Sequence, residues 1–441
     1  MTQPTAHRIE TDSLGDIAIP AQSAWGSQTQ HAIDNFPITG VAISHYPELI
    51  VALAQIKAAC AQANADLGCV NRDTAAIITE ICNEIISGKH HDQFVVDVMQ
   101  GGAGTSSNMN ANEVIANLGL KRLGHEFGDY QHLHPNDHVN RSQSTNDVYP
   151  TAIRLAVLAR TQPLIEVMHG LIAAFRNKGD EFNHIRKVGR TQLQDAVPMT
   201  LGDEFRSFAT TIGEDVDRLT EISTLLTEVN LGGTAIGTGI NAPQGFTNLA
   251  VGHLRELAGA PLTSATDLIE ASSDLGGLVA YSGILKRIAV KLSKICNDLR
   301  LLSSGPRAGI GEIILPPVQA GSSIMPGKVN PVIPEVVNQV CFQVIGNDVT
   351  ITFAAEAGQL QLNAMEPVIL HKLMESMGTL TQAIHVLTTR CINDTKADEV
   401  RCQILLGNSL IRATELAPII GYEAASKLAK FAQANGLDLI H

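Results

Sequence analysis

The sequence predicts a mainly α-helical protein built around a central bundle of long helices. Two observations lead to this prediction. Apolar residues recur every three or four positions over long central stretches, which is the period of a helix face packed on other helices. Strand signals are few, because aromatic residues make up only 4% of the 441 residues and alternating β-branched runs are scarce. A chain of this length holds about two to four domains.

The expected elements follow in chain order. Residues 1–40 are turn-rich and are expected to form loops and short strands. A helix is predicted over about 48–66, after Pro47. Two further helical faces comprise Leu164, Met168, Leu171, Ile172 and Phe175, and then Ile212, Val216, Leu219, Ile222, Leu226 and Val229. The longest apolar series runs Leu278, Tyr281, Leu285, Ile288, Leu292, Ile295, Leu299 and Leu302.

The series from Leu278 to Leu302 predicts a helix roughly 37 Å long at about 1.5 Å per residue. Its alternating gaps of three and four residues are typical of a seam between helices that cross at a shallow angle. Asn393-Asp394-Thr395 then predicts a loop and cap before a C-terminal helical region.

Composition excludes several classes of function. The 31 basic and 44 acidic side chains give a net charge of −13, which argues against nucleic acid or an anionic membrane as a partner. No run of about 20 apolar residues predicts a membrane span, and no apolar segment near Met1 predicts a secretory signal. The seven cysteines are scattered without a Cys-x-x-Cys pair, as expected for reduced, buried thiols in a cytoplasmic protein.

The segment Gly321–Pro331, Gly-Ser-Ser-Ile-Met-Pro-Gly-Lys-Val-Asn-Pro, is the most informative stretch. Glycine and proline make it a loop. Its backbone N–H groups, the charge of Lys328 and the amide of Asn330 suit a small carboxylate. It is not a phosphate loop, because five residues separate its glycines and Val329 follows the lysine.

Three more polar clusters interrupt the helical pattern and are expected to lie between helical segments. They are Gly101–Asn110, the segment His134–Asp137 leading into Ser142–Asp147, and Gly189–Ala196. Each taken singly is read as a helix N-cap, since Ser, Thr, Asn and Asp are the preferred cap residues. Four such clusters in one chain favour a shared anion site. The histidines show no zinc-binding spacing, so no metal site is predicted.

These four clusters, in this order on a helical chain, resemble the fumarase/aspartase superfamily. Gly321–Pro331 is similar to the family's signature loop, and the resemblance extends over almost the whole chain. It implies a three-domain fold: an N-terminal mixed domain at 1–144, a central long-helix domain at 145–393, and a small helical domain at 394–441. The last is expected to be shorter than in the family.

Details resemble the aspartase branch of the family. Gly102–Ser106 has the aspartase form, and Gln192 stands where fumarases carry His. Glu366 precedes a proline where fumarases tend to have a basic residue. The resemblance implies reversible removal of ammonia from L-aspartate to give fumarate, with no required cofactor. Class II fumarate hydratase is the nearest alternative, and a non-catalytic crystallin-like member is another, although Ser322, Lys328 and Asn330 are intact.

The resemblance also implies roles for individual residues. Ser322 would be the general base, and Glu335 would act indirectly behind the signature loop. The β-carboxylate would be held by Thr105, Ser144, Thr145 and Ser323, with Ser106 beside them. The α-carboxylate would be held by Thr191, Lys328 and Asn330. The amino group would face Asn146, Thr105 and Gln192. His134, Asn136 and Asp137 are expected to be structural.

The resemblance finally implies a homotetramer whose central bundle combines long helices from four subunits. Each active site would then take residues from three chains. The seam at Leu278–Leu302 is consistent with this, because one chain's bundle is not expected to cover all of it.

Overall fold

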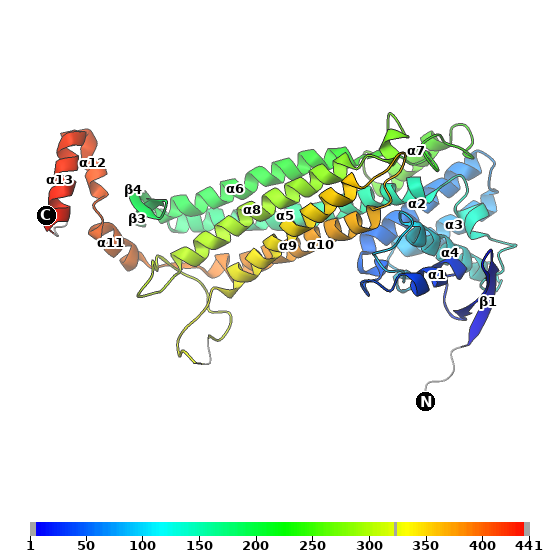
Figure 1. Ribbon diagram of the computed structural model, residues 1–441, viewed down its shortest axis with the longest axis horizontal. Coiled ribbons are helices and arrows are strands. Elements are labelled where there is room, and N and C mark those ends of the chain that lie inside the picture. The colour runs from blue at the N-terminus through cyan, green and yellow to red at the C-terminus, as the bar shows by residue number, and fades with distance from the viewer. Residues whose placement is uncertain (1–5, 322–323, 436–441) are drawn as a thin grey trace. The chain divides into compact units, whose positions relative to one another are not determined.

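The computed structural model describes residues 6–321 and 324–435. It is mainly helical, as predicted (Figure 1). Five helices are long: α5 (Thr145–Glu181), α6 (Leu201–Ser223), α8 (Gly276–Leu302), α9 (Val332–Glu356) and α10 (Glu366–Arg390). The shorter helices are α1 (Ser27–Asn35), α2 (Pro47–Asp66), α3 (Arg72–Ile86), α4 (Thr105–Arg122), α7 (Phe246–Ala258), α11 (Glu399–Asn408), α12 (Arg412–Ile420) and α13 (Tyr422–Asn435).

The strands are short and pair two by two. Two pairs are antiparallel hairpins: β1 (His7–Asp12) with β2 (Gly15–Pro20), and β3 (Arg186–Thr191) with β4 (Gln194–Thr200). The other two pairs have two residues per strand: β5 (Glu228–Val229) with β6 (Thr263–Ser264), which is parallel, and β7 (Ile313–Ile314) with β8 (Lys396–Ala397), which is antiparallel. The strands therefore form only short two-stranded pairings within a helical protein.

The backbone forms two compact units, and each of the five long helices has residues in both. Unit 1 comprises residues 1–162, 219–284 and 346–377, and unit 2 comprises residues 163–218, 285–345 and 378–441. The three domain ranges expected from the sequence stay a prediction.

In unit 1, α2 lies at the centre of the short helices and packs against α3 and α7. Pro47 starts α2, where its missing N–H leaves no hydrogen bond unmade. Polar pairs join the long helices. The Thr161 and Tyr281 hydroxyls lie 2.7 Å apart between α5 and α8. Ser282 Oγ donates to Asp348 Oδ1 at 2.8 Å between α8 and α9.

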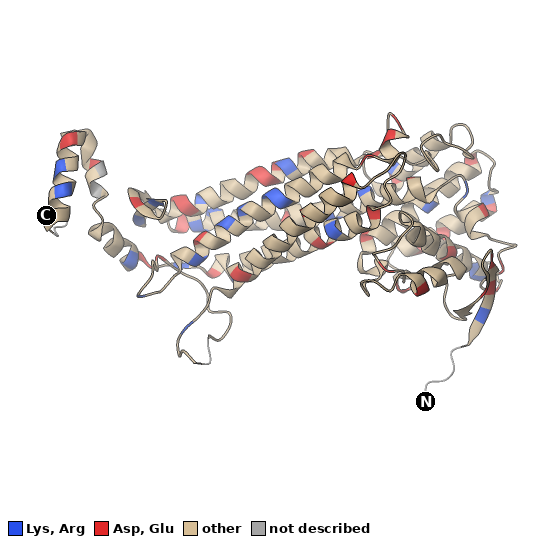
Figure 2. Cartoon of the chain, in the orientation of Figure 1, with Lys and Arg blue, Asp and Glu red and all other residues tan. Residues whose placement is uncertain are grey.

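In unit 2, an aromatic cluster joins α5 to α6. Phe175 of α5 and Phe182, the residue directly after α5, pack on Phe205 and Phe208 of α6, with ring centroids 5.3–6.2 Å apart. Charged residues occur along α6 and α8 in Figure 2, and some form ion pairs. Lys291 Nζ lies 3.1 Å from the buried Asp215 Oδ1, which ties α8 to α6. This packing confirms that the long apolar series belong to helices that pack on one another.

The predicted helix over Leu278–Leu302 is confirmed as α8, and the helix at 48–66 is confirmed as α2. The series ending at Val229 was wrong at its end, because α6 stops at Ser223 and Val229 lies in β5. The hydroxyls of Ser223 and Thr224 donate to the Leu219 and Glu221 carbonyls, and such local bonds compete with continuation of the helix.

One other local expectation was wrong. Residues 27–35, expected as loop or strand, form α1. The cluster Gly189–Ala196 lies between α5 and α6, as expected, and contains the turn of the β3–β4 hairpin. Across residues 6–321 and 324–435, no helix has both the length and the apolar character needed to span a membrane. All seven cysteines are free thiols, and six are buried.

Candidate active site

The site residues expected from the sequence fall into two groups. Unit 1 holds Thr105, Ser106, Ser144, Thr145 and Asn146, and unit 2 holds Thr191, Gln192, Lys328, Asn330 and Glu335. Ser322 and Ser323 lie outside the described residues. Each group is built by its own local structure.

The first group begins with a left-handed turn before α4. Gly102, Ala103 and Gly104 have φ values of 88°, 54° and 87°, which turn the chain sharply into the helix. A Cβ on Gly104 would lie 2.3 Å from the ring of Tyr149 on α5. Glycine at this position therefore allows the start of α4 to approach the start of α5. This close approach places Thr105 at the first turn of α4.

A hydrogen bond joins the first turns of the two helices. Asn108 Nδ2 on α4 donates to Thr145 Oγ1 on α5 at 3.1 Å. Helix N-termini carry partial positive charge and unpaired N–H groups, so they favour an anion nearby. Thr105, by contrast, uses its hydroxyl to donate to the Gly102 carbonyl at 2.6 Å.

The start of α5 is capped reciprocally. The Ser144 hydroxyl accepts from the N–H of Asn146 at 3.3 Å, and Asp147 Oδ1 accepts from the N–H of Ser144 at 2.9 Å. The other oxygen of Asp147 accepts at 2.9 Å from the N–H groups of both Gly232 and Thr234. Asp147 therefore fixes the turn that carries Ser144, Thr145 and Asn146.

Asn146 is held in one orientation by the same neighbouring loop. The side-chain Nδ2 of Asn146 donates to the Ala235 carbonyl at 2.8 Å, and the backbone carbonyl of Asn146 accepts from Asn230 Nδ2 at 2.9 Å. Asn230 is fully buried. Because one amide N–H is committed to Ala235, the amide plane of Asn146 is set before any substrate arrives.

A buried lysine supports this group from behind. Lys57 on α2 has no exposed surface, and its three N–H donors match three amide oxygens. Nζ lies 2.7 Å from Asn108 Oδ1, 2.8 Å from Asn140 Oδ1 and 2.9 Å from Gln143 Oε1. Asn108 in turn holds Thr145, and Gln143 directly precedes Ser144. Lys57 thus connects the parts of unit 1 that carry the expected site residues.

Burial changes the proton affinity of two charged groups in this network. Burial lowers the pKa of Lys57 to about 8, although nearby Cys60 and Asp147 oppose this change. Burial raises the pKa of Asp147 to about 6, against the effect of the N–H groups of Ser144, Thr234 and Gly232. The positive Lys57 also favours the charged form of Asp147.

In unit 2, Thr191 and Gln192 lie at the tip of the β3–β4 hairpin. Gln192 and Leu193 have φ values of 53° and 61°, as in the two-residue turn that suits the strand twist. The hairpin is held at both strands: Arg190 lies 2.9 Å from the buried Glu312, and Ser409 Oγ donates to Asp195 Oδ2 at 2.6 Å. Thr191 and Gln192 themselves are exposed.

The described part of the signature loop is also exposed. Residues 324–330, including Lys328 and Asn330, all face solvent. Lys328 donates its N–H to the Met325 carbonyl at 3.2 Å, and Gly327 has a φ of 80°, so the segment turns tightly. Glu335 is partly buried in the first turn of α9.

The structure supports a structural role for the segment at His134. His134 Nδ1 accepts from the N–H groups of Asn136 at 3.1 Å and Asp137 at 3.2 Å, capping a short π-helical turn (Pro135–Val139). The imidazole therefore acts as an N-cap.

Lys57 and Asn230 lie outside the polar clusters of the sequence, and Asn108 lies inside the first cluster but was given no individual role. One local signal was present: Ser144-Thr145-Asn146-Asp147 fits the pattern of a capping box. Lys57 is the one charged residue in the apolar stretch Leu49–Ala63, which is a weak sign of a buried, paired charge. Its three partners are distant in sequence and follow only from the fold.

Comparisons with known proteins place this site in a family. A family model described as Lyase matches residues 15–346. Aspartate ammonia-lyase from Pseudomonas fluorescens is 58% identical over 99% of this chain and 91% of its own length. Aspartate ammonia-lyase from Escherichia coli (strain K12) is 53% identical over 97% of this chain and 90% of its own length.

Solved structures agree with these relatives. Fumarate lyase:delta crystallin from Brucella melitensis has a TM-score of 0.96 and 56% identity, covering 98% of this chain and 94% of that one. A class II fumarase from Schistosoma mansoni has a TM-score of 0.93 and 33% identity, with the same coverage of both chains. The chain belongs to the lyase family that contains the fumarases and aspartases. Full-length relatives confirm the prediction of the aspartate ammonia-lyase branch.

Proposed function

We propose that this chain catalyses the reversible deamination of L-aspartate to fumarate and ammonia. The observation that carries this function is its 58% and 53% identity, over nearly its whole length, to curated aspartate ammonia-lyases. Gln192 and the segment Gly102–Ser106 agree with that branch. Fumarate hydratase remains the alternative for a direct assay to test.

The chemical difficulty is a weakly acidic proton on the carbon beside the β-carboxylate. Its removal places a second negative charge on that carboxylate, giving an aci-carboxylate, and loss of ammonia then forms the double bond. Preorganised hydrogen-bond donors lower this barrier, and each donor typically raises the rate by a factor of about 10²–10³. In the proposal Ser322 removes the proton, while Lys328 and the backbone N–H groups of the loop stabilise its alkoxide.

The described geometry supports Thr145 as a donor to the β-carboxylate. Its oxygen already accepts from Asn108, so the hydroxyl proton is available to a substrate oxygen. The N-terminus of α5 adds positive potential beside it. Thr105 donates to the Gly102 carbonyl, so it must rotate its hydroxyl to join Thr145. Ser106, Ser144 and Ser323 complete the proposed contacts to this carboxylate.

Thr191, Lys328 and Asn330 are proposed to bind the α-carboxylate, and Asn146, Thr105 and Gln192 to face the amino group. Gln192 orients by hydrogen bonding and does not titrate, so the proposal gives it no role in proton transfer. Glu335 is proposed to act indirectly, from the first turn of α9. No cofactor is required in this scheme.

We propose that the active enzyme is a homotetramer with shared sites. Thr105, Thr191, Gln192, Lys328 and Asn330 are exposed in the single chain, where water would screen the charges that must act on the dianion. Covering them with other subunits would exclude that water. The exposed apolar side chains on α9 offer a surface for such an assembly. A cytoplasmic location stays a prediction.

The test follows fumarate absorbance with L-aspartate and, separately, with L-malate as substrate. Fumarate is expected from L-aspartate. Ser322→Ala should reduce kcat by at least about 10³-fold, because the base is lost while the binding groups remain. Ser303→Ala, in the loop after α8, serves as a serine control with unchanged turnover. Turnover of L-malate alone would replace the proposal with the hydratase, and normal kcat in Ser322→Ala would remove that residue as the base.

A further inference from the structure

We propose that His125, Asp129 and His132 form a binding site for a first-row transition-metal ion such as Zn²⁺ or Co²⁺. The three residues lie in unit 1, in the connection between α4 and the turn at Pro135. They take no part in the proposed deamination. The inference is therefore independent of the proposed function.

The donor atoms are already close together. His125 Nδ1 lies 3.5 Å from Asp129 Oδ2, and His132 Nε2 lies 3.7 Å from the same oxygen. All three donor atoms lie within 4.8 Å of one another. Tetrahedral zinc sites have bonds of about 2.0–2.2 Å, which place neighbouring ligand atoms about 3.3–3.6 Å apart. The two carboxylate–imidazole separations, 3.5 and 3.7 Å, are close to this ligand spacing.

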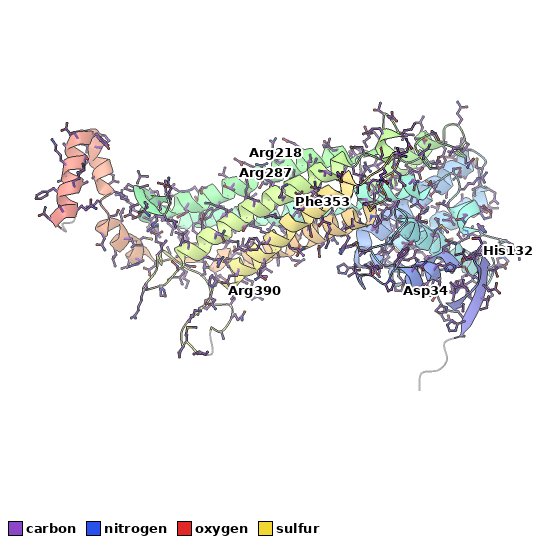
Figure 3. All side chains as sticks on the ribbon, in the orientation of Figure 1. Asp34, His132, Arg218, Arg287, Phe353 and Arg390 are labelled. Atoms are coloured by element: carbon purple, nitrogen blue, oxygen red, sulfur yellow. The ribbon has the colours of Figure 1, made fainter. Side chains whose placement is uncertain are left out.

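The two imidazoles define what must move on binding. Their rings are stacked, with centroids 3.8 Å apart and planes 9° from parallel. A metal binds an imidazole nitrogen in the plane of its ring, so two stacked rings cannot both bind one ion. His132 is the more exposed side chain, at 43% against 33% for His125, and it is labelled in Figure 3. Binding therefore requires its ring to turn out of the stack.

The carboxylate is oriented for this role. Gln131 Nε2 donates to Asp129 Oδ1 at 2.9 Å, which leaves Oδ2 directed to the histidines. Hydrogen bonds of this kind hold a ligand's orientation and raise metal affinity. Asp129 Oδ2 is therefore the central donor of the three.

The loop that carries the three ligands is itself anchored. Gly128 donates its N–H to Asn117 Oδ1 at 2.8 Å, and His125 donates its N–H to the Leu120 carbonyl at 2.9 Å. Gly124 and Gly128 have φ values of 85° and 86°, which allow the tight turns that bring the ligands together. Ligands on an anchored loop lose little freedom on binding.

The donor set selects the class of metal. Two imidazole nitrogens and one carboxylate oxygen suit Zn²⁺, Co²⁺ or Ni²⁺, whereas Mg²⁺ and Ca²⁺ prefer oxygen ligands alone. Water would complete the coordination, because all three side chains are partly open to solvent. The pair of His253 and Asp66, 2.9 Å apart in the same unit, offers a matched control.

The experiment titrates the full chain, prepared without a polyhistidine tag, with Co²⁺ and with Zn²⁺ by calorimetry and visible absorption. One ion per chain is expected, with cobalt bands typical of nitrogen and oxygen ligands. H125Q/H132Q should weaken binding by at least about tenfold, with D129N also weaker, because ligands are lost. H253Q should bind like the unsubstituted chain. Bound metal should raise the melting temperature of the unsubstituted chain and leave that of H125Q/H132Q unchanged.

Three results would overturn the proposal. One is equal affinity in the unsubstituted chain and H125Q/H132Q. Another is thiolate-to-cobalt charge-transfer absorption, which would assign the ion to cysteines. The third is equal displacement of Co²⁺ by Mg²⁺ at the same concentration, which would mean that imidazole nitrogens do not select the ion.

Discussion

Lys57 shows how one buried charge can position a binding surface that it does not touch. The lysine has no exposed surface. A buried ammonium is usually paired with a carboxylate, but Lys57 forms no ion pair with any of the described residues. Its charge is instead distributed over the amide oxygens of Asn108, Asn140 and Gln143. Because Asn108 also donates a hydrogen bond to Thr145, loss of the Lys57 contacts would displace a side chain that is proposed to bind the substrate.

Lys57→Met tests this relation at the scale of one residue. The change removes three donors and leaves the buried Asn108 oxygen and the partly buried Asn140 and Gln143 oxygens without them, and an unsatisfied buried group costs about 1–3 kcal/mol. We expect a loss of about 2–5 kcal/mol in unfolding free energy and at least a tenfold fall in kcat. Denaturant unfolding and steady-state kinetics measure the two effects. Lys89→Met, at an exposed lysine of the same unit, is the control. Kinetics and stability equal to that control would show that the network is dispensable.

At the scale of elements, Asp97 ties the segment after α1 to the loop before α4. Its carboxylate accepts from the N–H groups of Thr39, Gly40 and Met99 and from the Thr39 hydroxyl, at 2.7–2.9 Å. The backbone carbonyl of Asp97 accepts from Gln100 Nε2, and Gln100 Oε1 accepts from the N–H of Ser107 on α4. Burial alone would raise the pKa of Asp97, but these hydrogen bonds outweigh it and lower the pKa.

Asp97→Asn should therefore destabilise the protein in a pH-dependent way. A carboxyl with a lowered folded-state pKa stabilises the fold fully above its unfolded pKa of about 3.9, and this stabilisation is lost as pH falls through the folded-state value. We expect a loss of about 2–3 kcal/mol at pH 7 that shrinks below about pH 4. Melting temperatures measured from pH 3 to pH 7 check this. Asp34→Asn, at the exposed Asp34 labelled in Figure 3, should show no such trend. A constant difference across this range would contradict the assignment.

Elements defined by local patterns were predictable, and those fixed by distant residues were not. The apolar series at Leu278–Leu302 was sufficient to locate α8. By contrast, α1 depends on Glu113, whose carboxylate accepts from the N–H groups of Gly26, Gln28 and Thr29 at its N-terminus, 84 or more residues away in sequence. The β3–β4 turn uses Gln192 and Leu193 in left-handed conformations, without the Asn-Gly signal that marks such turns.

The same distinction applies to the site. The clusters containing Thr105 and Thr145 were recognisable as polar interruptions of a helical chain, and resemblance to the family assigned their roles. Their connection through Asn108 required the approach of α4 to α5, which Gly104 permits beside Tyr149. No local pattern encodes that approach, because it depends on the packing of residues 45 positions apart (149 − 104).

At the scale of the whole molecule, α9 presents apolar side chains to solvent. Phe342, Val349 and Phe353 are 61%, 52% and 67% exposed, and their spacing of seven and four places them on one helical face. Exposed rows of large apolar residues mark interaction surfaces. In the proposed tetramer this face of α9 packs against other subunits, and the exposed Thr191 and Lys328 gain neighbours from them.

Phe353→Asp should break that assembly, because it places a charge on a surface that must lose water. Light scattering coupled to gel filtration should find a shift from tetramer to smaller species, and activity should fall in proportion to the tetramer lost, since a site that draws on several chains cannot form in one. Val400→Asp is the matched control, because Val400 on α11 is 66% exposed. An intact, fully active tetramer in Phe353→Asp would exclude this residue from the interface. A fully active monomer would go further, because it would show that one chain completes the site by itself.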